Sequence, residues 1–297
     1  MFSLRSVVTI ASAALLGACS SSGPTGESTC SSGNALRVCS TGATIKGVDV
    51  STYEGTVNWP SVKASGHVFG IARISDGLNH TDATFVPNWH GMKAAGVIRG
   101  AYQFFRPSQD PIQQADLVIA ALAGAGAIAS GDLPAVLDLE VTDGMANAVV
   151  VSRAKQWLAH IEAATGRKPI VYTAAFMSAT IGTSFGAYPL WVANYGASCP
   201  SMPSGWTDWR FWQDSSTGTV PGISGNVDTN EFQGTLAQLK TFTEGAAGQP
   251  HDAGSPPFVD AGTSDPNAHV QGGAGSVMGD GFRGAAELGP VTCGAGK

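Results

Sequence analysis

Short runs of hydrophobic residues, many of them β-branched or aromatic, recur through the middle of the chain and predict eight strands. These runs occupy residues 45–51, 68–75, 97–105, 133–141, 168–173, 188–195, 209–214 and 226–232. Longer segments with helical periodicity separate the early runs and predict helices at 82–95, 110–129 and 147–165. Strands that alternate with helices are typical of a parallel sheet covered by helices.

The number of strands indicates that this sheet closes into an α/β barrel. The helical segments become short after Thr173, so we expect the last strands to connect without full crossover helices. The predicted fold is therefore an irregular TIM-like barrel that is regular only in its first half.

Composition divides the 297-residue chain into four regions. Residues 1–18 form the first of them. Residues 19–44 are rich in serine and glycine, which indicates a tether. Residues 45–243 contain nearly all of the aromatic residues and form the predicted barrel domain. Residues 244–297 hold 13 glycines and 5 prolines in 54 positions, and we expect this tail to be disordered.

The first 18 residues have the pattern of an export signal peptide, with Arg5 ahead of a short apolar stretch. The sequence Leu16-Gly17-Ala18-Cys19 resembles a bacterial lipobox, in which the cysteine becomes lipidated. We therefore expect an exported lipoprotein that is anchored to a membrane through Cys19. The alternative is an ordinary signal peptide and a secreted protein.

Four further cysteines would then remain in an oxidising compartment, where disulfides form. Cys30 and Cys39 are near enough in sequence to close a short loop, which would leave Cys199 for Cys293. Sequence alone does not determine connectivity, so this pairing is an expectation only.

Charge and spacing exclude several classes of protein. The net charge is −6 and no basic stripe is present, so we expect no nucleic-acid partner. No apolar run reaches the roughly 18 residues that span a bilayer, which excludes a multi-pass membrane protein. The six histidines show no paired ligand spacing and the cysteines form no C-x-x-C pair, so we expect neither a metal nor another cofactor.

Acidic residues are scarce, which makes their positions informative. Asp138 and Glu140 lie two residues apart at the C-terminal end of a predicted strand, so their side chains share one face. Asp49 lies at the same end of the first strand, and Asp228 lies in the last strand. The first and last strands are neighbours in a closed barrel, and α/β barrels carry their sites at the C-terminal strand ends. We therefore expect four carboxylates at one mouth.

A carboxylate cluster in a cleft is suited to the hydrolysis of glycosides. One acid must remain protonated near neutral pH to protonate the leaving oxygen, and burial and nearby negative charge raise its pKa. A second carboxylate stabilises the developing positive charge or acts as the nucleophile. We expect Phe104 and at least one tryptophan to be core residues. Aromatic rings that are predicted to contact sugar lie on or just beyond the strands, at Tyr102, Tyr172, Trp191 and Tyr195.

Seven short blocks of sequence occur along the predicted barrel domain. They are Asp-Val-Ser (49–51), Gly55 with Asn58-Trp59, Gly-Ala-Tyr (100–102), Leu-Asp-Leu-Glu (137–140), Pro-Ile-Val-Tyr-Thr (169–173), Leu-Trp-Val-Ala-Asn-Tyr (190–195) and Val-Asp-Thr-Asn (227–230). In their order and spacing they resemble glycoside hydrolase family 25, the Chalaropsis-type lysozymes or N-acetylmuramidases, over about residues 45–240.

The resemblance implies a barrel of five β/α units followed by three strands. It implies cleavage of the β-1,4 bond between N-acetylmuramic acid and N-acetylglucosamine in peptidoglycan, by a protein that we expect to be a monomer. Glu140 would be the general acid, and Asp138 would orient the substrate acetamido group or stabilise a charged intermediate. Asp49 and Asp228 would tune this pair and hold the sugar. Gln103 stands where many relatives have a histidine, and it cannot titrate.

Three other interpretations deserve comparison with this one. Residues 182–186 match G-x-S-x-G, but residues 174–181 have a helical pattern where a nucleophile elbow needs a strand. A chitinase-like barrel usually has two further aspartates upstream, where this chain has Leu133 and Val136. The remaining alternative is a non-catalytic lipoprotein that binds peptidoglycan or another glycan on the same fold. Loss of an acid would indicate it, and all four acids are present.

Overall fold

The computed structural model describes residues 35–244 of the chain. The predicted signal peptide, Cys19, Cys30 and the tail that contains Cys293 lie outside the described residues. Within the described part, no helix is both long and apolar enough to cross a membrane.

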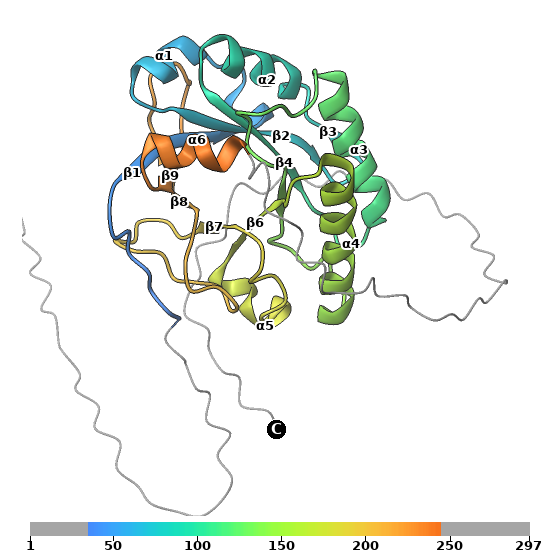
Figure 1. Ribbon diagram of the computed structural model, residues 1–297. Coiled ribbons are helices and arrows are strands. Elements are labelled where there is room, and N and C mark those ends of the chain that lie inside the picture. Colours follow the sequence, from blue (N-terminus) through green and yellow to red (C-terminus); the bar gives the residue numbers. More distant parts are fainter. Residues whose placement is uncertain (1–34, 245–297) are drawn as a thin grey trace, which may run out of the picture. The chain divides into compact units, whose positions relative to one another are not determined.

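Eight strands close into a barrel, as the hydrophobic pattern predicts (Figure 1). The strand β1 completes the barrel because it pairs in parallel with β2 and antiparallel with β9. A two-residue strand, β3, forms a short hairpin with β2 and was not predicted. The strands are β1 (Thr44–Val50), β2 (Phe69–Asp76), β3 (His80–Thr81), β4 (Ile98–Phe104), β5 (Val136–Asp138), β6 (Ile170–Ala174), β7 (Leu190–Ala193), β8 (Phe211–Gly218) and β9 (Val227–Gln233).

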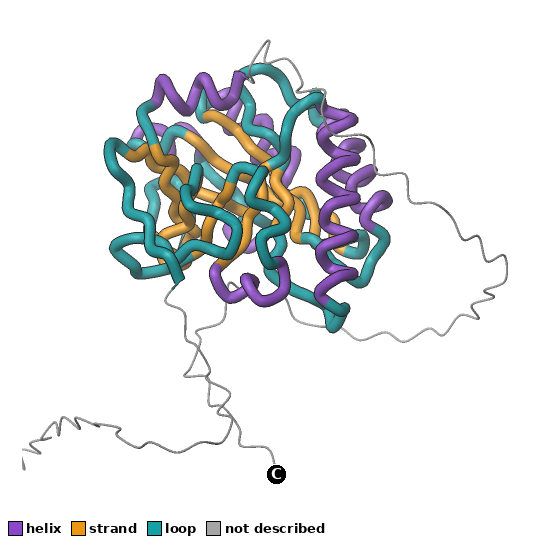
Figure 2. The backbone as a smooth tube through the Cα atoms, turned by 60° about the horizontal axis from the view of Figure 1, so that its bottom comes forward, coloured by secondary structure: helices purple, strands orange, loops and turns teal. Residues whose placement is uncertain are grey.

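Five β/α units precede three strands that are connected without long helices, so the predicted irregular TIM-like barrel is confirmed. Helices lie around the outside of the strands (Figure 2). The helices are α1 (Trp59–Ala64), α2 (Phe85–Ala94), α3 (Pro111–Gly124), α4 (Asn147–Thr165), α5 (Ser178–Ile181) and α6 (Leu236–Glu244), with 3₁₀ turns η1 (Thr52–Glu54) and η2 (Ala175–Met177).

Local sequence explains where the two long helices begin and end. The carboxylate of Asp110 accepts hydrogen bonds from the backbone N–H groups of Ile112 and Gln113, and Pro111 occupies the first turn of α3. Gly166 ends α4 with a φ of 66°, a left-handed conformation that glycine adopts without steric cost.

Alternation along the strands separates an outer core from an inner one. In β1, Val48 and Val50 face outward and pack in the hydrophobic layer beneath the helices, whereas Asp49 between them faces inward. At the N-terminal end of the barrel, Phe69, Phe211 and other apolar residues pack against α6 and fill the interior. The barrel is therefore filled at one end, and polar side chains occupy the other.

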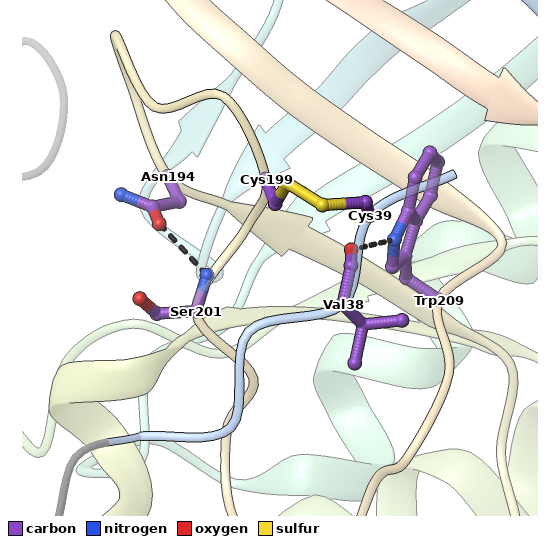
Figure 3. Close-up of a disulfide and its surroundings, with 6 residues drawn as sticks. All are labelled: Val38, Cys39, Asn194, Cys199, Ser201 and Trp209. Atoms are coloured by element: carbon purple, nitrogen blue, oxygen red, sulfur yellow. Dashed lines mark hydrogen bonds between the residues drawn. A yellow bond between two sulfur atoms is a disulfide. The ribbon is translucent and has the colours of Figure 1, made fainter. Parts of the chain in front are cut away.

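Residues 35–43 were assigned to the tether, but they pack against the outside of the barrel beside the β7–β8 connection. The backbone N–H of Val38 donates to the Pro200 carbonyl at 3.1 Å, and the Trp209 indole donates to the Val38 carbonyl at 2.8 Å (Figure 3). The backbone N–H of Met202 donates to the Leu36 carbonyl at 2.7 Å. These bonds hold the segment against the β7–β8 connection, which contains no helix.

The expected disulfide pairing is wrong, because Cys39 is bonded to Cys199 (Figure 3). Cys39 therefore cannot pair with Cys30, nor Cys199 with Cys293. The physical reason is the backbone pairing described above, which brings the two Cα atoms to 4.5 Å although 160 positions separate them in sequence.

We expect the double substitution Cys39→Ser/Cys199→Ser to lower the free energy of unfolding by roughly 2–5 kcal/mol, because the cross-link closes a long loop in the unfolded chain. Guanidinium unfolding of the oxidised protein, followed by tryptophan fluorescence, measures this loss. Cys30→Ser is the control and should leave the unfolding midpoint unchanged. A loss of stability in that control would indicate the pairing predicted from sequence.

Candidate active site

A cavity of about 260 Å³ opens at the C-terminal ends of the parallel strands, and all four predicted acids line it. Asp49 is near the end of β1, Asp138 ends β5, and Glu140 follows two residues later. Asp228 lies on β9 directly opposite Asp49 in the antiparallel register. Because β9 runs antiparallel to β1, the beginning of β9 reaches the same mouth as the end of β1.

The predicted aromatic residues lie together in the same cavity, but they are not equally accessible. Tyr172 and Trp191 are 5% and 1% exposed, and their rings are 4.7 Å apart in an edge-to-face arrangement. They therefore form the floor, while Tyr102 and Tyr195 remain half-buried along the wall. Phe104 was expected in the core but lines the cavity.

Local turns hold the rim of the cavity close to β1. Ser51 caps the 3₁₀ turn η1, and its backbone N–H donates to the Glu54 carboxylate at 2.7 Å. The backbone N–H of Thr52 donates to Asp82 at 2.8 Å. These bonds hold Tyr53 at the rim, where its side chain is 45% exposed and the Arg73 guanidinium lies 5.2 Å from its ring centroid.

Burial and mutual repulsion alter the protonation of the acids on β5. Desolvation, and then the charge of Asp228, raise the pKa of Glu140 from 4.5 to about 7. Desolvation and the neighbouring Glu140 hold the pKa of Asp138 well above its usual range. This environment favours a protonated carboxyl group at neutral pH, which is what a general acid requires.

The carboxylates of Asp49 and Asp228 share one neutral hydrogen-bond donor, the amide of Gln213. Gln213 Nε2 lies 2.9 Å from Asp49 Oδ2 and 3.2 Å from Asp228 Oδ2. Asn230 Nδ2 donates to the same Asp49 oxygen at 2.7 Å, and Trp191 Nε1 donates to the Asn230 amide oxygen at 2.8 Å. Burial and the charge of Asp228 nevertheless raise the pKa of Asp49 well above its usual range.

Arg73 lines the cavity, but its guanidinium forms its ion pair with Asp82 rather than with the four predicted acids. Its Nε donates to Asp82 at 3.0 Å within a buried ion pair. Its Nη2 atom, like Asp138 Oδ1, is buried and has no hydrogen-bond partner among residues 35–244. Within the same part of the chain, no group of three His, Cys, Asp or Glu side chains is arranged to hold a metal ion.

Sequence reasoning missed several residues that build this cavity, above all Gln213, Asn230 and Arg73. A signal was present for Asn230, which lies two positions after Asp228 and therefore shares its face of the strand. Nothing distinguished Gln213 or Arg73, because the sequence does not reveal that their strands close around the same space.

Two other sequence features lie outside the cavity. Gln103 faces the opposite side of β4, where its amide donates to Ser75 at 2.8 Å and accepts from the Trp157 indole at 2.7 Å. It is therefore a buried structural residue beneath α4. Ser184 of the G-x-S-x-G match follows the short helix α5 rather than a strand, which is the wrong setting for a nucleophile elbow.

Comparison with known proteins agrees with this geometry. The sequence pattern of Glycosyl hydrolases family 25 matches residues 48–223. Lysozyme M1 of Streptomyces globisporus is 36% identical over 214 residues, which are 68% of this chain and 72% of that protein. An N,O-diacetylmuramidase of Chalaropsis sp is 31% identical over 68% of this chain and all of its own length.

The same likeness holds for the fold. The crystal structure of a bacterial lysozyme from Streptomyces coelicolor superposes with a TM-score of 0.63 at 34% identity, covering 68% of this chain and 98% of that one. The barrel and its acidic cavity are thus those of a glycoside hydrolase. The chain belongs to Glycosyl hydrolases family 25.

The raised pKa of Glu140 predicts that the difference in stability between the wild type and Glu140→Gln depends on pH. The folded chain keeps the Glu140 proton up to about pH 7 and the unfolded chain loses it near pH 4.5, so this group's contribution to stability falls as the pH rises through that window. We expect Glu140→Gln to match the wild type near pH 4 and to exceed its free energy of unfolding by about 3 kcal/mol near pH 8. Urea unfolding at both pH values measures this, and an equal difference at both would contradict the raised pKa.

Proposed function

We propose that this protein is a lysozyme, which hydrolyses the β-1,4 bond between N-acetylmuramic acid and N-acetylglucosamine in bacterial peptidoglycan. The observation that carries the proposal is the position of Glu140, a half-buried acid with a pKa raised to about 7, inside a cavity that Asp49, Asp138 and Asp228 also line. Relatives named lysozyme and N,O-diacetylmuramidase support the choice of substrate.

In the proposed mechanism, Glu140 is the general acid that donates its proton to the glycosidic oxygen. Asp138, two residues before Glu140, orients the acetamido group of the N-acetylmuramic acid residue so that its oxygen bonds to the anomeric carbon as the bond to the leaving oxygen breaks. A water molecule then adds to the anomeric carbon and displaces the acetamido oxygen, and one proton of that water returns to Glu140. Asp49 and Asp228 keep the cavity negative, which stabilises the positive charge that develops at the anomeric carbon. The charge of Asp228 also raises the pKa of Glu140, so that Glu140 keeps its proton to higher pH.

Aromatic groups at two depths would position the glycan. Tyr172 and Trp191 are buried enough to form only the base of the site. Tyr102 and Tyr195 line the wall, and the exposed Tyr53 ring at the rim offers a flat face for a sugar unit further along the strand.

The proposal predicts that Glu140→Gln lowers peptidoglycan hydrolysis by at least about 10²-fold, because the amide has no proton to donate to the leaving oxygen. Products should be reduced with borohydride and read by mass spectrometry, with new reducing ends expected on N-acetylmuramic acid. Glu162→Gln, the same change on the outer helix α4, is the control and should keep full activity.

Reducing ends on N-acetylglucosamine would instead change the assigned bond. An inert wild-type protein that still binds insoluble cell wall would favour the alternative, a glycan-binding lipoprotein on this fold. Full activity in Glu140→Gln would remove Glu140 from the mechanism.

We also propose that the protein is exported and anchored to a membrane by lipid on Cys19, with the segment up to residue 34 as the tether. The lipobox-like Leu16-Gly17-Ala18-Cys19 supports this, as does the serine- and glycine-rich sequence that follows it. We expect a bacterial host that lipidates proteins to incorporate a labelled fatty acid into the wild type and not into Cys19→Ala. Cys30→Ala is the control, and equal labelling of Cys19→Ala would contradict the anchor.

A further inference from the structure

Gln213 is a buried, neutral side chain that is hydrogen-bonded to four residues of the cavity lining. We propose that Gln213 is a positioning residue that clamps Asp49 and Asp228 in the arrangement that Glu140 needs to act as general acid. This inference rests on the proposed function and deepens it, because it assigns control of the acid to a residue outside the carboxylate set.

The contacts of Gln213 use all of its principal hydrogen-bonding positions. Its Nε2 faces Asp49 and Asp228 at 2.9 and 3.2 Å, and its Oε1 accepts from the hydroxyls of Tyr172 and Tyr195 at 2.7 and 2.8 Å. Ionised carboxylates can only accept hydrogen bonds, so the amide nitrogen must face them and the amide oxygen must face the phenols. Only one orientation of the amide satisfies all four partners.

This arrangement is rigid because its members come from different parts of the barrel. Gln213 lies on β8 and is 3% exposed, while its partners come from β1, β6, β9 and the loop after β7. The register of β8 against β9 shifts directly after Gln213, at an irregularity between Gln213 and Ser215. Such irregularities re-aim neighbouring side chains, and here Asp214 turns instead toward Thr229, at 3.1 Å.

The chemistry of the clamp matters because its two acids repel each other. Asp49 and Asp228 are directly paired across β1 and β9, and the charge of Asp228 raises the pKa of Asp49. The hydrogen bond that Gln213 donates to Asp49 favours the charged form of that carboxylate, and the neutral amide adds no positive charge that would lower the pKa of Glu140. A lysine or arginine at position 213 would add a positive charge, which would lower the pKa of Glu140.

The charge on Asp228 is the link to the general acid, since it is the largest charged contribution that raises the pKa of Glu140. Arg106 opposes it and Asp76 adds to it. The other titratable groups that act on Glu140, Asp49 or Asp138 in this cavity are Glu54, Arg73, Tyr102, Tyr172 and Tyr195. Loss of the clamp would remove the hydrogen bond by which Gln213 holds the Asp228 carboxylate in its present position, and weaker repulsion from Asp228 would then lower the pKa of Glu140.

The test compares the pH dependence of peptidoglycan hydrolysis in the wild type, Gln213→Met and Gln213→Glu. We expect Gln213→Met to lower kcat by at least about tenfold and to move the alkaline limb of the profile down by about half a pH unit. Gln213→Glu loses the same donated bonds but adds a carboxylate, whose negative charge raises the pKa of Glu140. The alkaline limb of Gln213→Glu should therefore lie at higher pH than that of Gln213→Met.

A matched control is available in Gln103→Met. Gln103 is also buried and hydrogen-bonded through both ends of its amide, but it lies on the opposite side of the sheet and faces α4 rather than the cavity. We expect this variant to lose stability while it keeps the wild-type alkaline limb. Thermal unfolding of every variant separates loss of fold from loss of the clamp.

The inference is overturned if both Gln213 variants keep the wild-type alkaline limb, or if Gln103→Met shifts it equally, since the residue would then be structural only. If Gln213→Met does not fold, the isosteric Gln213→Glu decides the outcome, because a variant that keeps both the wild-type kcat and the wild-type alkaline limb without the donated hydrogen bonds would overturn the inference. An inactive wild type would refute the proposed function itself, and that result is distinct from an active wild type whose profile the variants leave unchanged.

Discussion

The strand β1 forms hydrogen bonds on both of its edges, and the active site exists because of this double pairing. Parallel pairing with β2 and antiparallel pairing with β9 close the sheet, and closure sets Asp49 opposite Asp228. Gly47 contributes to the same junction, because a Cβ there would clash with the ring of Phe69 that fills the barrel beneath it. Because the sheet is closed and apolar side chains fill one end of the barrel, the cavity is open only at the C-terminal ends of the parallel strands.

The electrostatic design of this cavity depends on neutral donors rather than on cations. Asp49 and Asp138 are each 5% exposed, and burial of charged groups is costly unless hydrogen bonds compensate it. Gln213 and Asn230 provide such bonds to Asp49, while the Arg73 guanidinium is committed to Asp82. A direct ion pair to an arginine would lower the pKa of these acids, whereas amides stabilise their geometry and leave the cavity negative.

A similar arrangement limits the effect of a nearby cation on Glu140, which lies two residues beyond β5. Arg106 is the cation that acts on Glu140, but it forms two hydrogen bonds to Asp76, whose negative charge opposes its effect. The result is a carboxyl group that retains its proton to about pH 7 and therefore has the protonation state that glycoside cleavage requires.

In the irregular half of the barrel, packing on the outer surface helps to position a side chain in the active site. The β7–β8 connection, together with residues 35–43, covers the strands where a crossover helix is missing, and Cys39–Cys199 joins the two segments. This connection also carries Tyr195, whose hydroxyl reaches Gln213 in the cavity. Tertiary packing on the outside of the sheet thus helps to fix a side chain on the inside.

Much of this protein was determined by the sequence alone. The alternation of Val48, Asp49 and Val50 already placed one acid on an inner face, and the two-residue spacing of Asp138 and Glu140 placed another pair. The strands, the long helices and the family followed from such local patterns, because periodicity and short blocks are properties of neighbouring residues. Tertiary structure alone decided the disulfide partner of Cys39, the packing of residues 35–43 and the four contacts of Gln213. Each of these joins residues that are distant in sequence, and only closure of the barrel brings such residues within bonding distance.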